Sequence, residues 1–197
     1  MKGGISLAQI EVQIAEDGIT SVLVVSTVED LWNDYQHFSK MASEASVSRF
    51  EEKRYLRTAL IVLVAYCGAV ADKWCSVELK KDMMSGPDIE HWLRNFCFEK
   101  KCTYLIESAQ KRQRIQAKEL NYKFKALRNR IIHVRIGDDL NLYHDLTQKV
   151  LHQAESEMLT FFDEIGAALG MERHVNTEEI ADSFSKALGT AVDSASF

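Results

Sequence analysis

The sequence is poor in residues that interrupt helices, with one proline and nine glycines among 197 residues. Because proline removes a backbone donor and glycine loosens a helix, this scarcity favours long uninterrupted helices. Hydrophobic residues make up 46% of the chain and charged residues 27%, which is typical of a soluble globular protein. The length fits one domain of ordinary size, or one domain with an appendage.

Signals for membranes and for secretion are also absent. No run of 18 apolar residues occurs, and the best candidate, residues 59–70, is too short to span a bilayer and is flanked by charge. The N-terminus lacks a basic region followed by an apolar core and a small-residue cleavage site, so we expect no signal peptide. These features predict a cytoplasmic protein with no membrane partner.

Several catalytic signatures are missing as well. The chain has no His-x-x-x-His pair, no glycine-rich phosphate loop and no Gly-x-Ser-x-Gly elbow, which argues against metalloproteases, NTPases and α/β-hydrolases. The cysteines Cys67, Cys75, Cys97 and Cys102 lack the spacing of a disulfide framework, so reduced thiols are expected. Cys97 and Cys102 lie near His91 but without a second close pair, and we expect no metal and no cofactor.

The charge is unevenly distributed, although the formal net charge of the chain is only −5. Residues 99–135 contain eleven basic and three acidic residues, hence 11 − 3 = +8, which leaves −5 − 8 = −13 for the rest. Such a contrast is typical of a local surface for a polyanion on a body that otherwise repels one. The simpler alternative is a solvated helix face.

Residues 5–26 differ from the remainder of the chain. Apolar and polar residues alternate over 10–14, Glu16-Asp17-Gly18 supplies a turn, and 19–25 is mostly β-branched and apolar, which predicts a β-hairpin. A two-stranded hairpin is not stable alone, so it must pack on the helical body or on a partner chain.

Helical periodicity follows from Ser26 onward. The predicted helices cover about 27–38, 48–84, 87–96, 103–135 with a break near 109–117, 142–169, and 177–188. The second is apolar nearly all round between Ala59 and Val70, as expected of a central helix covered on several sides. We therefore predict an all-α antiparallel helical bundle of four to five main helices with an N-terminal β-hairpin appendage. Its parts are the hairpin (1–27), the bundle (28–170), and a short helix with a loose tail (171–197).

One short motif carries chemistry. Arg128-Asn129 precedes His133 at the end of the basic segment, on a predicted helix. This Arg-Asn-x-x-x-His string resembles the signature of the HEPN superfamily, the "higher eukaryotes and prokaryotes nucleotide-binding" domains. The likeness covers roughly residues 28–170. One departure is that members often carry a glutamate inside the central helix, where this chain has Ala65-Tyr66-Cys67-Gly68-Ala69-Val70, with Asp72 as the nearest acid.

The resemblance implies a metal-independent endoribonuclease that acts as a homodimer, with RNA as substrate. It also implies a setting such as a toxin–antitoxin pair or phage defence, often with a nucleotidyltransferase-type antitoxin as partner. Some members have lost activity and serve as scaffolds, so a non-catalytic module that binds RNA or nucleotide, or mediates protein interaction, is the alternative.

The residue types suit that chemistry. Histidine exchanges protons near neutral pH, so His133 fits an acid/base role, and the paired donors of Arg128 fit a phosphate. Asn129 is four residues before His133 and shares its helix face, whereas Arg128 is about 140° round the helix, a spacing that a cleft between two subunits would accommodate. Lys125, Arg130 and Arg135 would bind flanking phosphates. The simpler alternative is a cationic helix C-terminus with a surface histidine.

Overall fold

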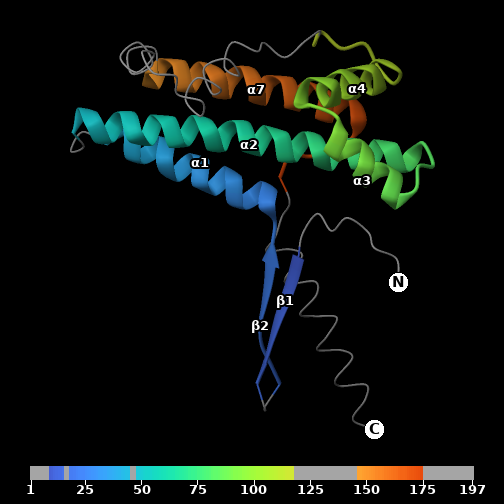
Figure 1. Ribbon diagram of the computed structural model, residues 1–197, viewed down its shortest axis with the longest axis horizontal. Helices are drawn as coiled ribbons and strands as arrows, with labels where there is room; N and C mark the ends of the chain where they lie inside the picture. The colour runs from blue at the N-terminus through green and yellow to red at the C-terminus, as the bar shows by residue number, and fades with distance from the viewer. Residues whose placement is uncertain (1–8, 16–17, 45–47, 118–145, 175–197) are drawn as a thin grey trace.

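The computed structural model describes residues 9–15, 18–44, 48–117 and 146–174. The elements are β1 (Gln9–Ala15), β2 (Gly18–Val25), α1 (Thr27–Ser43), α2 (Arg49–Lys81), α3 (Gly86–Asn95), α4 (Phe98–Gln110) and α7 (Gln148–Leu169). From Ser26 onward the described residues form helices and their connections, so the prediction of an all-α body is confirmed there. Figure 1 shows α2 between α1 on one side and α7 on the other.

The 33-residue helix α2 is the centre of the fold. It starts where the sequence predicted, because Ser48 and Glu51 form a capping box in which the Ser48 hydroxyl accepts from Glu51 N and the Glu51 carboxylate accepts from Ser48 N. The helix ends at Lys81, after which Met83 adopts a left-handed backbone conformation with φ of 63°. A chain reversal follows, and Pro87 in the first turn of α3 starts the next helix as predicted.

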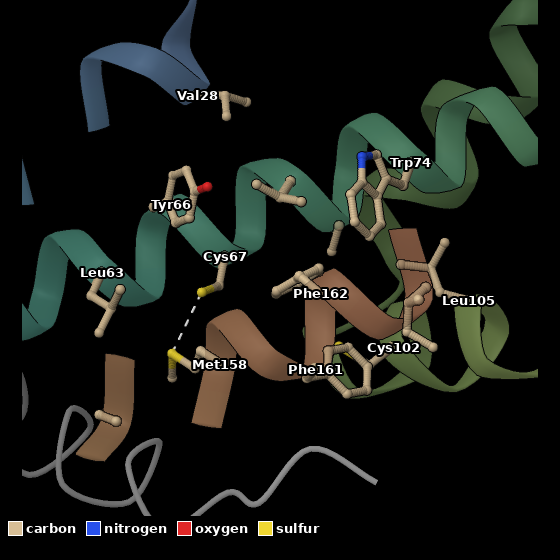
Figure 2. Close-up of a cluster of buried hydrophobic side chains, with 14 of the residues drawn as sticks. Val28, Leu63, Tyr66, Cys67, Trp74, Cys102, Leu105, Met158, Phe161 and Phe162 are labelled. Atoms are coloured by element: carbon tan, nitrogen blue, oxygen red, sulfur yellow. Dashed lines mark hydrogen bonds between the residues drawn. The ribbon is translucent and has the colours of Figure 1, made fainter. Parts of the chain in front are cut away.

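The predicted apolar positions of α2 form the core. Leu56, Leu60, Leu63, Cys67, Val70 and Trp74 are buried, and Val64 is partly buried. Figure 2 shows Leu63, Cys67 and Trp74 of this row on the side of α2 that faces Met158 and Phe162 of α7, and the Cys67 thiol lies 3.5 Å from the Met158 sulfur. Of the three tryptophans, Trp74 belongs to this core, and Trp32 and Trp92 pack against it.

Helices α1 and α2 run antiparallel. Trp32 near the start of α1 lies against Tyr66, with ring centroids 5.1 Å apart, and Phe38 further along α1 stacks on Tyr55 at 6.5 Å. Residues further along α1 therefore contact residues earlier in α2, which means that the two helices run in opposite directions. This pair follows the rule that a short connection produces antiparallel neighbours.

Helices α2 and α7 run in the same direction, which differs from the purely antiparallel bundle that the sequence predicted. Lys53 Nζ donates to the carbonyl of Leu146 at the first ends of the two helices. Trp74 Nε1 donates to the Glu172 carbonyl at their far ends, 3.3 Å away. The short-connection rule does not apply to this pair, because α3, α4 and residues 111–147 intervene between them.

The ends of α4 and α7 bear on the predicted boundaries. Helix α4 stops at Gln110, and residues 111–117 are not helical, which confirms the predicted break. Gly170 ends α7 in the left-handed conformation, where the sequence predicted the end of the helix. Thr147 caps α7 by accepting from Val150 N, so residues 146 and 147, which the predicted helix 142–169 included, are not helical. The predicted helix 177–188, and the parts of predicted helices within 118–145, lie outside the described residues.

Strands β1 and β2 pair in antiparallel fashion before α1. Their register is Gln9 with Val25, Ile10 with Val24, Glu11 with Leu23, Val12 with Val22, Gln13 with Ser21, Ile14 with Ile19 and Ala15 with Gly18. A bulge lies between Gln13 and Ile14. Figure 1 shows the two strands pointing away from the layer of helices.

Helix α2 has the length and the hydropathy of a membrane span, judged on the described residues. Half of its most apolar window is buried inside the protein. A central core helix has the same composition, so this property does not separate the two roles.

Candidate functional site

The residues of the predicted catalytic and RNA-binding site all lie outside the described part of the chain. They are Arg128, Asn129 and His133 for catalysis, and Lys125, Arg130 and Arg135 for flanking phosphates. The structure describes the chain up to Ala117 and again from Leu146, so it shows where the segment 118–145 leaves the helical body and where it rejoins it.

Each attachment point makes a hydrogen bond to the helical body. On the entering side, the backbone N–H of Gln116 donates to the carboxylate of Glu164 on α7. On the leaving side, Leu146 is buried and its carbonyl accepts from Lys53. The first attachment lies toward the C-terminal end of α7 and the second at its N-terminal end.

Part of the basic segment has internal partners, which reduces the positive charge available to a ligand. Lys101 is nearly buried and lies 2.6 Å from Asp72 Oδ1 of α2. Arg112 pairs with Glu78, also of α2. Two of the eleven positive charges are thus balanced by acids outside the segment, and the surplus falls from +8 to +8 − 2 = +6.

In the ion pair with Arg112, Glu78 is the buried partner, with a side chain only 5% exposed. One carboxylate oxygen accepts from Lys81 at 2.7 Å and the other from Arg112, whose guanidinium also donates to the Leu169 carbonyl at the end of α7. A buried carboxylate needs such partners. This group ties α2, the chain after α4, and α7 together. The sequence offered one signal for this link: Glu78 is an acidic residue at a position where the apolar period of α2 predicts a buried side chain.

A cluster of charged and aromatic side chains lies where the chain leaves α7. Arg173 is the centre: its Nε donates to Asp163 Oδ1 at 2.7 Å and its Nη1 to the Tyr66 hydroxyl at 3.1 Å. Burial works to lower the pKa of Arg173, but the bonds to Asp163 and Tyr66 outweigh it and the pKa is raised. Burial raises the pKa of Tyr66, and the neighbouring Arg173 partly opposes that rise.

His174 extends the same set toward α1. Its Nδ1 lies 3.3 Å from Glu29 Oε2, its Nε2 lies 3.4 Å from Arg173 Nη1, and its ring packs against Trp32 and Tyr66. A carboxylate only accepts and a guanidinium only donates, so this network assigns the proton of the neutral ring to Nδ1.

Backbone contacts complete the arrangement. Lys73 Nζ donates to the carbonyls of Glu172 and Arg173, at 3.3 and 3.5 Å, and burial lowers its pKa although Glu29 and Glu172 oppose the effect. Glu172, Arg173 and His174, which we call the C-terminal clasp, therefore bind α1, α2 and α7 at once. Their polar groups are used by the protein itself, so the clasp holds the fold together. The sequence offered one signal for this arrangement: Tyr66 stands at a position of α2 where burial is expected, and a buried tyrosine hydroxyl needs a hydrogen-bond partner.

No group of three or more His, Cys, Asp or Glu side chains in the described part of the chain could hold a metal ion. None of the four cysteines forms a disulfide; Cys67, Cys75 and Cys102 are buried and Cys97 is exposed. Burial raises the pKa of the Cys67 and Cys75 thiols, which makes them poor nucleophiles.

Comparison of the chain with protein-family models, with curated protein sequences and with solved structures gave no match.

Proposed function

We propose that this protein is a cytoplasmic, metal-independent endoribonuclease of the HEPN type that acts as a homodimer. The observation that carries the proposal is the sequence Arg128-Asn129-x-x-x-His133 at the end of the basic segment. The remaining surplus of positive charge around it supports an RNA substrate. A toxin–antitoxin or defence setting, with a nucleotidyltransferase-type antitoxin, remains part of the proposal through the family resemblance.

In the proposed reaction the RNA itself supplies the nucleophile. The 2′-oxygen attacks the adjacent phosphorus while His133 takes its proton, and the bond from phosphorus to the 5′-oxygen breaks as that oxygen receives a proton. The products are a 2′,3′-cyclic phosphate and a 5′-hydroxyl, and no metal or co-reactant is required. Arg128 would stabilise the extra negative charge on the phosphorus oxygens, and Asn129 would orient the imidazole or the phosphate.

The architecture we propose around this site is a helical bundle of residues 28–170 carrying the hairpin 1–27 as an appendage and a short C-terminal part, 171–197. Two features of the described helices support a fixed frame for the motif. The chain is attached to α7 at Gln116 before the motif and to α2 at Leu146 after it. Lys125, Arg130 and Arg135 would hold flanking phosphates from the same segment.

The test is cleavage of labelled RNA in EDTA by the wild type and by Arg128→Ala and His133→Ala. We expect each substitution to reduce the cleavage rate by about 10²–10⁴-fold, because each removes a group that acts in the transition state. End analysis of the products should find the cyclic phosphate on the 3′ side and a hydroxyl on the 5′ side.

Two matched controls separate chemistry from simple loss of charge. Arg94→Ala and His152→Ala remove exposed residues of the same types from α3 and α7 and should leave the rate unchanged. Equal cleavage by the wild type and both motif variants would refute the catalytic assignment. Loss of wild-type cleavage in EDTA would instead indicate a metal-dependent enzyme.

A non-catalytic module that binds RNA or nucleotide, or mediates protein interaction, is the second candidate. The centre of α2 lacks the glutamate that HEPN members often carry, and the acids further along, Asp72 and Glu78, are already paired with Lys101 and Arg112. RNA binding without cleavage, weakened by Lys125→Ala and Arg130→Ala, would favour this candidate over the enzyme.

A further inference from the structure

The first turn of α2 carries an aromatic side chain that the helical body leaves uncovered. Phe50 is 67% exposed, more than any other phenylalanine, tyrosine or tryptophan in the described part of the chain. The next most exposed ring, Phe96, is 38% exposed and packs on Trp92, with the two ring centroids 4.6 Å apart. No ring packs on Phe50 among the described residues. Burial in the core therefore does not explain a phenylalanine at this position.

Two arginines flank the Phe50 ring. Arg49 directly precedes it, and Arg54, four residues after it, lies on the same face of the helix. Both arginines are exposed, and neither forms an ion pair with a carboxylate of the described residues. Of the two acids between them, Glu51 already uses its carboxylate to accept from the residue that caps α2. The start of α2 therefore presents one apolar ring between two cations.

The surface formed by Arg49, Phe50 and Arg54, which we call the Phe50 surface, lies beside the point where the chain returns from the motif. Lys53, one turn after Phe50, donates to the carbonyl of Leu146, the residue at which the segment 118–145 rejoins the body. Figure 1 shows that α2 and α7 begin at the same end of the body. Residues 49–57 contain four basic and two acidic residues, hence 4 − 2 = +2. A second patch of positive charge therefore stands where the segment that carries the motif ends.

We propose that the Phe50 surface is a second contact for RNA, in which the Phe50 ring stacks on an unpaired base while Arg49 and Arg54 bind the phosphates beside it. The inference rests on the RNA substrate proposed above, and it adds residues outside the motif that select the form of that substrate. An aromatic side chain stacks on a base only where the base is not held inside a duplex. Stacking accepts any base, and arginine binds phosphates of any sequence, so the surface selects single-stranded RNA without selecting its sequence.

The residues around Phe50 favour RNA over a lipid surface. A helix that lies on a membrane buries a continuous apolar face in the bilayer. Phe50 is instead the one large apolar side chain of α2 that is exposed, and its neighbours Arg49, Glu51 and Arg54 are charged. A single ring is enough to stack on a base, but it is not enough to hold a bilayer.

Fluorescence anisotropy of a labelled oligoribonucleotide with 2′-O-methyl groups measures binding by the full chain while attack by the 2′-oxygen is blocked. We expect Phe50→Ala to raise the dissociation constant for the single strand by about 5- to 150-fold and to leave that for a duplex of the same sequence unchanged. Phe50→Tyr should bind like the wild type because it keeps the ring. Arg54→Ala should reduce the slope of log Kd against log salt concentration by about 0.7, as expected for one phosphate contact on a single strand.

Two matched controls test whether the effect belongs to this surface. Arg94→Ala on α3 and Phe96→Ala directly after it remove exposed residues of the same two types. Both controls should leave the dissociation constants and the salt slope unchanged. Thermal melts of Phe50→Ala and Arg54→Ala should match the wild type, so that loss of binding is not confused with unfolding.

Unchanged binding by Phe50→Ala, an equal loss in Phe96→Ala, or an equal loss for single strand and duplex would overturn the proposal. Binding of the wild type to phosphatidylserine vesicles in place of RNA, lost in Phe50→Ala, would also overturn it and assign the surface to a membrane. RNA cleavage is measured separately. Cleavage by the wild type with unchanged binding in Phe50→Ala removes this inference and leaves the enzyme, whereas loss of single-strand binding in Phe50→Ala by a protein that cleaves no RNA does the reverse.

Discussion

At the scale of single residues, two glycines of the helical body differ in the space around them, and the more crowded one lies where α7 passes α2. Gly166 faces the indole of Trp74 and the backbone of Met171, and the Met171 N–H donates to the Gly166 carbonyl at 2.9 Å. A methyl group at residue 166 would lie 2.6 Å from the Met171 oxygen and 2.8 Å from a Trp74 ring carbon. Gly68 in the middle of α2 has nothing within 4 Å of the same position. The two glycines therefore serve different purposes.

We predict opposite effects for the same substitution at these two sites. Gly166→Ala should lower the free energy of unfolding by about 1–3 kcal/mol, because a backbone oxygen and a fixed ring must move. Gly68→Ala should raise it by about 0.5–1 kcal/mol, because alanine restricts the unfolded chain and favours the helix. Urea denaturation of both variants and of the wild type measures these changes in the free energy of unfolding. A loss of stability in Gly68→Ala, or no loss in Gly166→Ala, would contradict this packing.

At the scale of elements, the C-terminal clasp is what joins the end of α7 to the other two long helices. Helices supply most of their own hydrogen bonds, so links between them depend on side chains that reach across. Arg173 makes the most such links, to Asp163 on α7 and to Tyr66 on α2. The clasp follows directly on the Gly170 cap, which turns the chain back toward α2.

Removing Arg173 should loosen this junction and change the ionisation of its partner. We expect Arg173→Ala to lower the free energy of unfolding by about 1–3 kcal/mol, because the buried Tyr66 hydroxyl loses its donor and the ion pair with the exposed Asp163 is lost. The pKa of Tyr66, already raised by burial, should rise further because the cation that opposes the rise is gone. Absorbance titration of tyrosinate and thermal melts measure the two effects. Arg94→Ala, at an exposed site on α3, should change neither.

At the scale of the whole molecule, three buried thiols report on opening of the core. Cys67 and Cys75 lie in α2 and Cys102 in α4, and all three are buried, whereas Cys97 at the start of α4 is exposed. We predict that a thiol reagent modifies Cys97 rapidly in the native protein. The other three should react only as fast as the chain unfolds, and together in urea. Cys97→Ser removes the fast phase; a second fast thiol in that variant would show that the core is less closed than described.

How far the sequence could predict this fold depends on whether the signal is local. Pro87 at the start of α3 and Gly170 after α7 are local signals, and both boundaries were predicted from a few neighbouring residues. The start of α2 near Ser48 was predicted from its apolar period, and the structure adds the Ser48–Glu51 capping box. The apolar period of α2 likewise predicted its buried face. Contacts between distant segments were beyond such reasoning. The parallel course of α7 along α2 follows from tertiary packing.

The candidate site illustrates the same division. The motif around Arg128 and His133 was identified from residue types and spacing, and its role remains a prediction because it lies outside the described residues. The ion pairs of Lys101 and Arg112 were not foreseen, since a count of charges along the chain cannot show which acids on α2 meet them. Exposure, rather than composition, decides how much charge a ligand encounters.

The parallel pairing of α2 with α7 also sets an order of events at the ribosome. Lys53 meets Leu146 and Cys67 meets Met158, so each contact joins residues more than 90 positions apart. Helix α1 can pack on α2 soon after both have left the exit tunnel. The other side of α2 must wait for about 90 more residues, roughly 5 to 20 s at ordinary rates of translation. During that interval the nascent chain presents the row of aliphatic side chains that α7 later covers, which makes it a natural client for a chaperone acting during synthesis.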